Sequence, residues 1–133
     1  MSNDEQYLDN DEQTVVILMT SGPDTPERCA TPFYLGSILA SMDAEVHIFF
    51  TMEGVKLMQN GVAENLVAME GGKKIIDFIR DAKRAGVILH VCQPALPGYK
   101  IDESADIIKE ADHVSRASVL GDLILECDKL ITF

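Results

Sequence analysis

The sequence lacks an apolar run long enough to cross a membrane, because its longest uninterrupted run covers only residues 15–19. Basic residues are also scarce: 11 Lys and Arg stand against 22 Asp and Glu, giving a formal net charge of −11. Such a chain repels phosphates, which argues against a nucleic-acid-binding protein. The first residues carry acid where a signal peptide carries base, so we expect no export.

Cysteine is sparse as well. The three cysteines, Cys29, Cys92 and Cys127, are odd in number and scattered, so they do not predict a disulfide framework. We therefore expect a cytoplasmic protein with reduced thiols. The chain has no CxxC or paired Cys/His spacing, no P-loop, and no GxGxxG after a strand-like run, so we expect no metal and no cofactor.

The acidic excess is concentrated at the N-terminus. Residues 1–13 contain five acidic residues and no Lys or Arg. Such a segment has little to pack into a core. We predict a disordered acidic leader over residues 1–13 and a single domain over residues 14–133.

Within that domain, apolar runs of strand length alternate with segments of helical period. Strands are predicted at residues 14–20, 45–51, 87–91 and 129–133, with a weakly indicated one at 112–115. Strands joined by helices of this length predict a parallel sheet with helices on both faces. The fold class is therefore a three-layer α/β domain.

Four segments supply the predicted helices: residues 25–42, 72–85, 104–111 and 118–126. Pro32 interrupts the first, so we expect residues 26–31 to form a separate turn capped by Thr25, with Thr31 capping the main helix. Gly86 should end the second helix. The last should turn its apolar residues inward, namely Val119, Leu120, Leu123 and Ile124.

Ligands of parallel α/β sheets bind at the carboxyl ends of the strands. Three loops are predicted there, and they supply the candidate binding crevice: Ser21, Gly22, Met52, Gln93 and Pro94.

Cys92 is the candidate reactive residue, because it ends the third predicted strand at this edge. Pro94, Pro97 and Gly98 make the next segment a loop, so the thiol should be incompletely buried. The alternative is an inert buried thiol, since free cysteine is among the most buried residue types. His90 lies two residues earlier and projects to the same face of the strand. It could tune the thiol, or it could be a hydrogen-bonded structural histidine.

Cys29 is a second thiol at the same edge, in the first turn of a predicted helix. The positive end of a helix and the adjacent Arg28 would lower a thiol pKa. The alternative, a small residue packed in the turn, is slightly favoured. Cys127 precedes the last strand at the opposite edge and is predicted to be in the core.

Several short motifs together resemble the DsrE/DsrF-like family of sulfur metabolism. They are Thr20-Ser21-Gly22-Pro23 followed by Pro32-Phe33, Phe49-Phe50-Thr51 followed by Gly54, Gly86-Val87 leading to Cys92, and the closing residues 126–133. The resemblance covers nearly the whole chain after the leader.

The resemblance implies a five-stranded parallel α/β/α sandwich and a homo-oligomer, trimeric or hexameric. It also implies a sulfurtransferase or sulfur carrier that holds sulfane sulfur as a persulfide on Cys92 and passes it between donor and acceptor proteins or small sulfane-sulfur compounds. Some relatives carry a second cysteine in the loop after the first, and this chain has none between Cys92 and Cys127.

Two other functions stay open. One is a non-catalytic subunit of a sulfur-relay or other assembly. The other is a small-molecule or nucleotide-binding α/β domain that uses the same crevice.

Overall fold

A five-stranded, wholly parallel sheet forms the centre of the computed structural model, which describes residues 12–133. The strand order is β4-β3-β2-β1-β5. The strands are β1 (Thr14–Met19), β2 (Glu45–Phe50), β3 (Ile88–Cys92), β4 (His113–Ser115) and β5 (Lys129–Thr132). The predicted three-layer α/β fold is therefore confirmed, including the weakly indicated strand that became β4.

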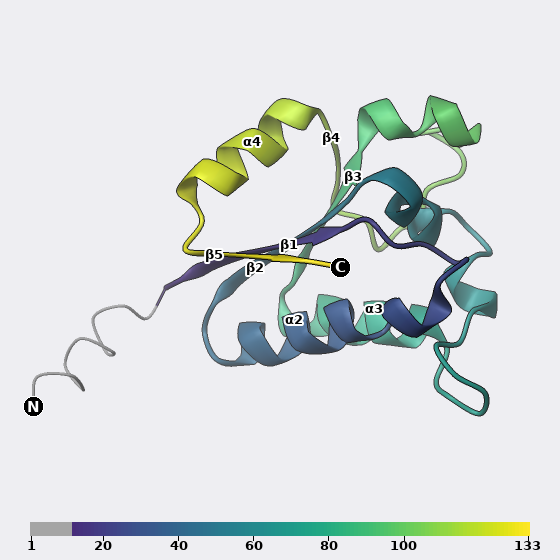
Figure 1. The fold of residues 1–133 in the computed structure, drawn as a ribbon, viewed down its shortest axis with the longest axis horizontal. Coiled ribbons are helices and arrows are strands. Elements are labelled where there is room, and N and C mark those ends of the chain that lie inside the picture. The colour runs from purple at the N-terminus through teal and green to yellow at the C-terminus, as the bar shows by residue number, and fades with distance from the viewer. Residues whose placement is uncertain (1–11) are drawn as a thin grey trace, which may run out of the picture.

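Helices cover both faces of this sheet (Figure 1). The first face carries α2 (Thr31–Ser41) and α3 (Ile75–Ala85), and the second carries α4 (Ala117–Glu126). Gly86 ends α3 in a left-handed conformation with φ of 100°, as predicted, because glycine adopts this conformation without a steric penalty.

The main apolar core lies between the sheet and the α2/α3 layer. Phe33 of α2 stacks on Phe50 of β2, with ring centroids 5.7 Å apart. Alternate residues of the three inner strands point to this side, as the period of a strand requires. The fully or nearly buried strand residues here are Val15, Ile17, Met19, Val46, Ile48, Phe50, Leu89 and Val91.

The start of the first helical segment differs from the predicted capping. A separate 3₁₀ turn, η1 (Pro26–Arg28), precedes α2 as expected. However, the Thr25 hydroxyl donates to the carbonyl of Gly22 instead of capping the turn. Thr31 is the first helical residue and not the cap, because Pro32 is placed in the first turn, where its missing N–H costs no hydrogen bond.

Residues 104–111 do not form the predicted helix. The Asp102 carboxylate accepts hydrogen bonds from the backbone N–H and the hydroxyl of Ser104, which favours a turn. The chain then pairs with an earlier loop, since the Ile108 N–H donates to the carbonyl of Met58 at 2.8 Å. Local side-chain bonding and this long-range contact together replace the helix.

The α4 helix is less buried than predicted. Val119, Leu120 and Leu123 are half-buried, but Ile124 is exposed and no residue of this helix is fully buried. Beside it, β5 forms an edge of the sheet and has three exposed residues out of four. Among residues 12–133, no helix is long and apolar enough to cross a membrane.

Candidate functional site

The loops that follow β1 and β2 interlock at the carboxyl end of the sheet. A methyl group added at Gly22 would lie 2.4 Å from the backbone oxygen of Glu53, and one added at Gly54 would lie 2.3 Å from that of Met19. The Thr51 N–H donates to the Met19 carbonyl at 3.0 Å. Only glycine permits these two approaches. The predicted residues Ser21, Gly22 and Met52 are thereby brought together.

The 3₁₀ helix η2 (Met52–Met58) extends this edge toward β3. Met52 has a positive φ of 54° and an exposed side chain. Lys56 forms an ion pair with Glu53 at 2.9 Å and lies over the ring of Tyr99, 4.8 Å from its centroid. Hydrogen bonds from Lys56 and Tyr99 lower the pKa of Glu53, and Glu53 raises the pKa of Tyr99. These contacts join the loop after β2 to the loop after β3.

Cys92 is the last residue of β3 and directly precedes two short 3₁₀ helices, η4 (Gln93–Ala95) and η5 (Pro97–Tyr99). Its side chain is 8% exposed, which is less than the proline-containing loop suggested. Leu96, which lies between the two helices, belongs to the same buried cluster as Cys92, so the loop packs on the core instead of projecting into solvent. Gln93 contacts Glu103, and Pro94 is exposed.

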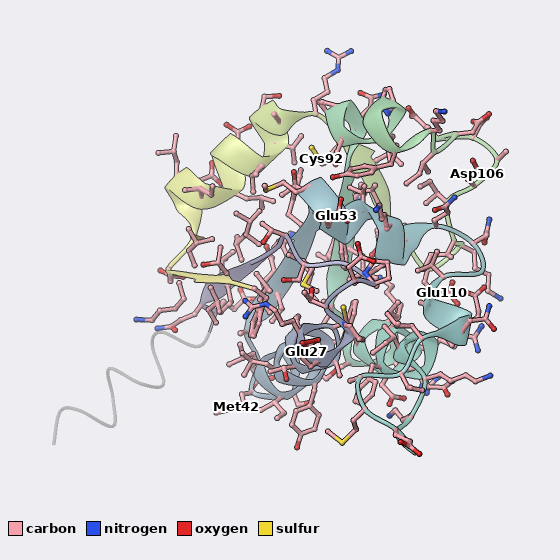
Figure 2. All side chains as sticks on the ribbon, turned by 45° about the vertical axis from the view of Figure 1, so that its right-hand side comes forward. Glu27, Met42, Glu53, Cys92, Asp106 and Glu110 are labelled. Atoms are coloured by element: carbon pink, nitrogen blue, oxygen red, sulfur yellow. The ribbon has the colours of Figure 1, made fainter. Side chains whose placement is uncertain are left out.

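Cys92 lies on the α4 side of the sheet, because it alternates with Leu89 and Val91 of the other side. In Figure 2, Cys92 and Glu53 lie at the same side of the molecule, in agreement with the packing of η2 against β3. The loops carrying the five predicted crevice residues thus form one continuous rim around the end of β3. We call this surface the carboxyl rim: Ser21, Gly22, Met52, Glu53, Lys56, Gln93, Pro94 and Tyr99.

Cys29 is fully buried, and its environment opposes thiolate formation. The thiol donates to the carbonyl oxygens of Gly22 and Thr25, at 3.3 and 3.5 Å. Burial is the largest cause that raises its pKa, Glu27 also raises it and Arg28 partly opposes them, and together they place the pKa at about 11. Arg28 does lower the pKa of this thiol, as expected, but burial outweighs it, so the slightly favoured alternative of a small residue packed in the turn fits.

The structure also places Arg28 and Cys127. The Arg28 guanidinium donates from Nε to the Ser21 hydroxyl at 2.9 Å, so its partner is a rim residue. Cys127 ends α4 and its thiol donates to the Ile124 carbonyl at 3.4 Å. It is half-buried, whereas a core position was predicted, because α4 covers the sheet incompletely.

His90 lies on the same face as Cys92, but its ring nitrogens contact other side chains. Nε2 lies 2.9 Å from Nδ1 of His47, and Nδ1 lies 3.4 Å from the Ser115 hydroxyl. His47 continues through Nε2 to the Glu45 carboxylate at 2.7 Å. Four side chains from three neighbouring strands are thus connected. We call them the polar chain: Glu45, His47, His90 and Ser115.

Sequence reasoning missed the polar chain and the Glu53–Lys56–Tyr99 cluster. The spacing of Glu45 and His47 was a weak signal, because residues i and i+2 of a strand share a face. The register that pairs Phe49 with His90 and Cys92 with Ser115 cannot be read from the sequence. Within residues 12–133, no group of three or more His, Cys, Asp or Glu side chains is arranged to hold a metal ion.

Comparisons with known proteins agree with this architecture. The family model described as "DsrE/DsrF-like family" matches residues 13–133. The crystal structure of the YchN protein from E. coli is similar at a TM-score of 0.68 and 18% identity, covering 91% of this chain and 99% of that one.

A protein of unknown function from Methanobacterium thermoautotrophicum, MTH1491, is similar at a TM-score of 0.56 and 12% identity, covering 92% of this chain and 99% of that one. At these identities the two structures support the fold alone. No curated protein sequence matches the chain. Because the family model spans almost the whole sequence, the chain belongs to the DsrE/DsrF-like family.

Proposed function

We propose that this protein is a sulfur carrier that holds sulfane sulfur as a persulfide on Cys92 and passes it to an acceptor thiol. Family membership supports a role related to sulfur relay in general. The observation that carries the specific proposal is the position of Cys92 at the end of β3, within the carboxyl rim. By contrast, Cys29 is sealed in the core and Cys127 lies at the far end of α4.

The chemistry needs only a thiolate and two partners. The Cys92 thiolate attacks the outer sulfur of a donor, a new S–S bond forms, and the donor's leaving group takes the electron pair of the broken bond. An acceptor thiolate then attacks the terminal sulfur, and Cys92 leaves again as a thiolate. The low exposure of Cys92 would shield the persulfide from stray reductants, while the rim would receive donor and acceptor.

The second candidate function is a non-catalytic subunit of a sulfur-relay assembly. The incompletely covered α4 and β5 favour it, because apolar surface of this kind marks a protein–protein contact. The same surface supports assembly into a trimer or hexamer in either case. We place the protein in the cytoplasm, where a reduced Cys92 would persist.

Intact-mass analysis after exposure to thiosulfate, tetrathionate or polysulfide tests the proposal. The wild type should gain one sulfur atom from thiosulfate, one or more from polysulfide and an –S–SO3⁻ group from tetrathionate, and Cys92→Ser should gain none of these while keeping its fold. Cys127→Ser is the matched control and should gain sulfur normally, as should Cys29→Ser once its folding is verified. Sulfur on the Cys92→Ser protein would mean that the nucleophile is wrong. Failure of every protein with every donor would favour the non-catalytic subunit.

A further inference from the structure

The outer side of α2 carries three large apolar side chains that no other part of the molecule covers. Tyr34, Ile38 and the C-cap residue Met42 are 61%, 39% and 70% exposed, whereas Phe33 of the same helix is fully buried. Because they are spaced by four residues, they form one ridge along the helix. Figure 2 shows Met42 and Cys92 at opposite sides of the molecule. We call these three residues the α2 ridge.

The α2 helix also lacks charge. Among the three α-helices of residues 12–133, it alone contains no Asp, Glu, Lys or Arg, and the uncharged stretch covers residues 29–42. By contrast, α3 has five charged residues among its eleven. A helix at the surface of a domain normally directs charged and polar side chains to solvent. The outer side of α2 is therefore not typical of a surface that stays in water.

The polar side chains beside the ridge do not depend on water either. The Ser37 hydroxyl donates to the Phe33 carbonyl at 2.8 Å, and the Ser41 hydroxyl donates to the Ser37 carbonyl at 2.9 Å. A hydroxyl that is already bonded within its own helix can be covered by another surface at a lower cost than an unpaired one. The ridge and its border can thus be buried together.

We propose that the α2 ridge is a self-association surface, on which two copies of the chain pair antiparallel about a two-fold axis at Ile38. In this arrangement Ile38 contacts its own counterpart, and Tyr34 of each copy contacts Met42 of the other. When ridges spaced by four residues interdigitate, the helix axes cross at about 50°. This contact is separate from the surface of α4 and β5, and it does not depend on the proposed sulfur chemistry.

Charge identifies a second copy as the occupant of the ridge. Each chain has a formal net charge of −11, so two copies repel each other wherever their acidic surfaces meet. The α2 ridge avoids this repulsion, whereas α4 carries Asp122 and Glu126 beside its exposed Leu125. A partner of opposite charge would gain little on an uncharged ridge. A two-fold contact needs only a surface that is complementary to itself.

The size of the contact predicts how it responds to concentration and salt. A standard interface buries roughly 800 Å² per partner, and a single helix ridge offers less. We therefore expect reversible pairing. Added salt should strengthen it, because salt screens the repulsion between two acidic chains and the ridge has no charged residue whose ion pair could be weakened.

Sedimentation velocity over a series of protein concentrations tests the pairing. Ile38→Glu and Met42→Glu each place a charge on the ridge of both copies at an exposed position, so folding should be kept. Because a two-fold contact joins equal halves, each variant should halve the particle mass at high concentration, whatever α4 contributes. The matched control is Met52→Glu, which adds the same charge at a 60% exposed methionine outside α2 and should associate like the wild type.

Oxidative cross-linking tests the antiparallel arrangement. In a Cys92→Ser, Cys127→Ser background, Ile38→Cys should form a disulfide-linked dimer, because the two copies of residue 38 meet at the axis. Met42→Cys should cross-link far more slowly. Each copy of residue 42 lies about 6 Å along the helix from the axis, so the pair is further apart than the roughly 7 Å that a disulfide spans between Cα atoms.

Several results would overturn the proposal. If the wild type has the same mass as Ile38→Glu and Met42→Glu at high concentration, the ridge serves another partner or none. Halving by Met52→Glu as well would mean that added charge alone disperses the protein. Pairing that salt weakens, or Met42→Cys that cross-links as fast as Ile38→Cys, would also contradict the arrangement. None of these results bears on sulfur uptake by Cys92, which has its own test.

Discussion

The two faces of the sheet differ in chemistry as well as in cover. The face under α2 and α3 is wholly apolar in its central strands and is closed by helices with buried residues. The face under α4 carries the histidines, Ser115 and Cys92, and its helix has no fully buried residue. One face supplies the stability of the domain, and the other carries groups that can titrate, react or contact a partner.

This division also explains why the two thiols at the carboxyl end differ. Cys29 belongs to the apolar layer, where burial raises its pKa to about 11. Cys92 projects to the other face, beside polar side chains that are hydrogen-bonded to one another. The position of a thiol along the chain therefore does not predict its reactivity unless the face of the sheet to which it projects is known.

The largest expected effect comes from truncating a side chain on each face. Phe33→Ala should lower the free energy of unfolding by roughly 3–5 kcal/mol, because Phe33 is fully buried against Phe50. Leu123→Ala, on the half-buried side of α4, should cost less than about 1.5 kcal/mol in the monomer. Urea denaturation of both variants measures the difference. Equal losses of unfolding free energy in the two variants would contradict the difference in packing between the two faces.

Acid should destabilise the protein through the α4 face. The pKa of His90 is about 4 when folded, against 6.5 for an unperturbed histidine, so the unfolded chain binds its proton first as pH falls. Stability should therefore fall by about 2.5 kcal/mol between pH 6.5 and 4 because of this residue. His90→Gln should lose that part of the pH dependence in thermal melts. If the stability of His90→Gln falls with pH as steeply as that of the wild type, the pH dependence does not come from His90.

The next effect concerns association and not folding. Leu125 of α4 is 86% exposed, and β5 beside it is an open sheet edge. We expect an oligomer in light scattering at micromolar concentration, and Leu125→Glu should shift it toward the monomer with little change in melting temperature. Leu35→Glu is a useful contrast, since it changes a half-buried position of the opposite face. A monomeric wild type would refute the predicted assembly.

The smallest effect is expected from the acidic leader. A chain that starts at Gln13 should melt within about 1 °C of the full protein, because five acids without a counter-charge add little packing. Residues 1–11 lie outside the described structure, so this remains a prediction from composition. A large drop in melting temperature would mean that Tyr7 and Leu8 pack on the domain.

The strands, the layers and the place of Cys92 could be predicted because they depend on local patterns. Continuous apolar runs mark buried parallel strands, and a strand followed by prolines marks its carboxyl end. The turn at residues 104–111 could not be predicted, because the contact of Ile108 with Met58 is long-range.

The polar chain was also beyond sequence reasoning. His90 and Cys92 share a face by simple alternation, but the partners of His90 come from β2 and β4. Those contacts depend on strand order and register, which no local pattern specifies. The place of Cys92 at the end of β3 could therefore be predicted from the sequence, while the hydrogen-bond partners of His90 could not.

The interlocking of Gly22 and Gly54 affects how a partner would associate with the carboxyl rim. Gly22 fits against the backbone of the loop after β2 and Gly54 against the last residue of β1, so the loops cannot shift without displacing these neighbours. A docking protein would meet a surface that is already in its binding shape and would lose little conformational entropy in ordering it. Encounter would then be limited by orientation and by the acidic charge of the chain, and partners with basic surfaces would associate faster at low salt.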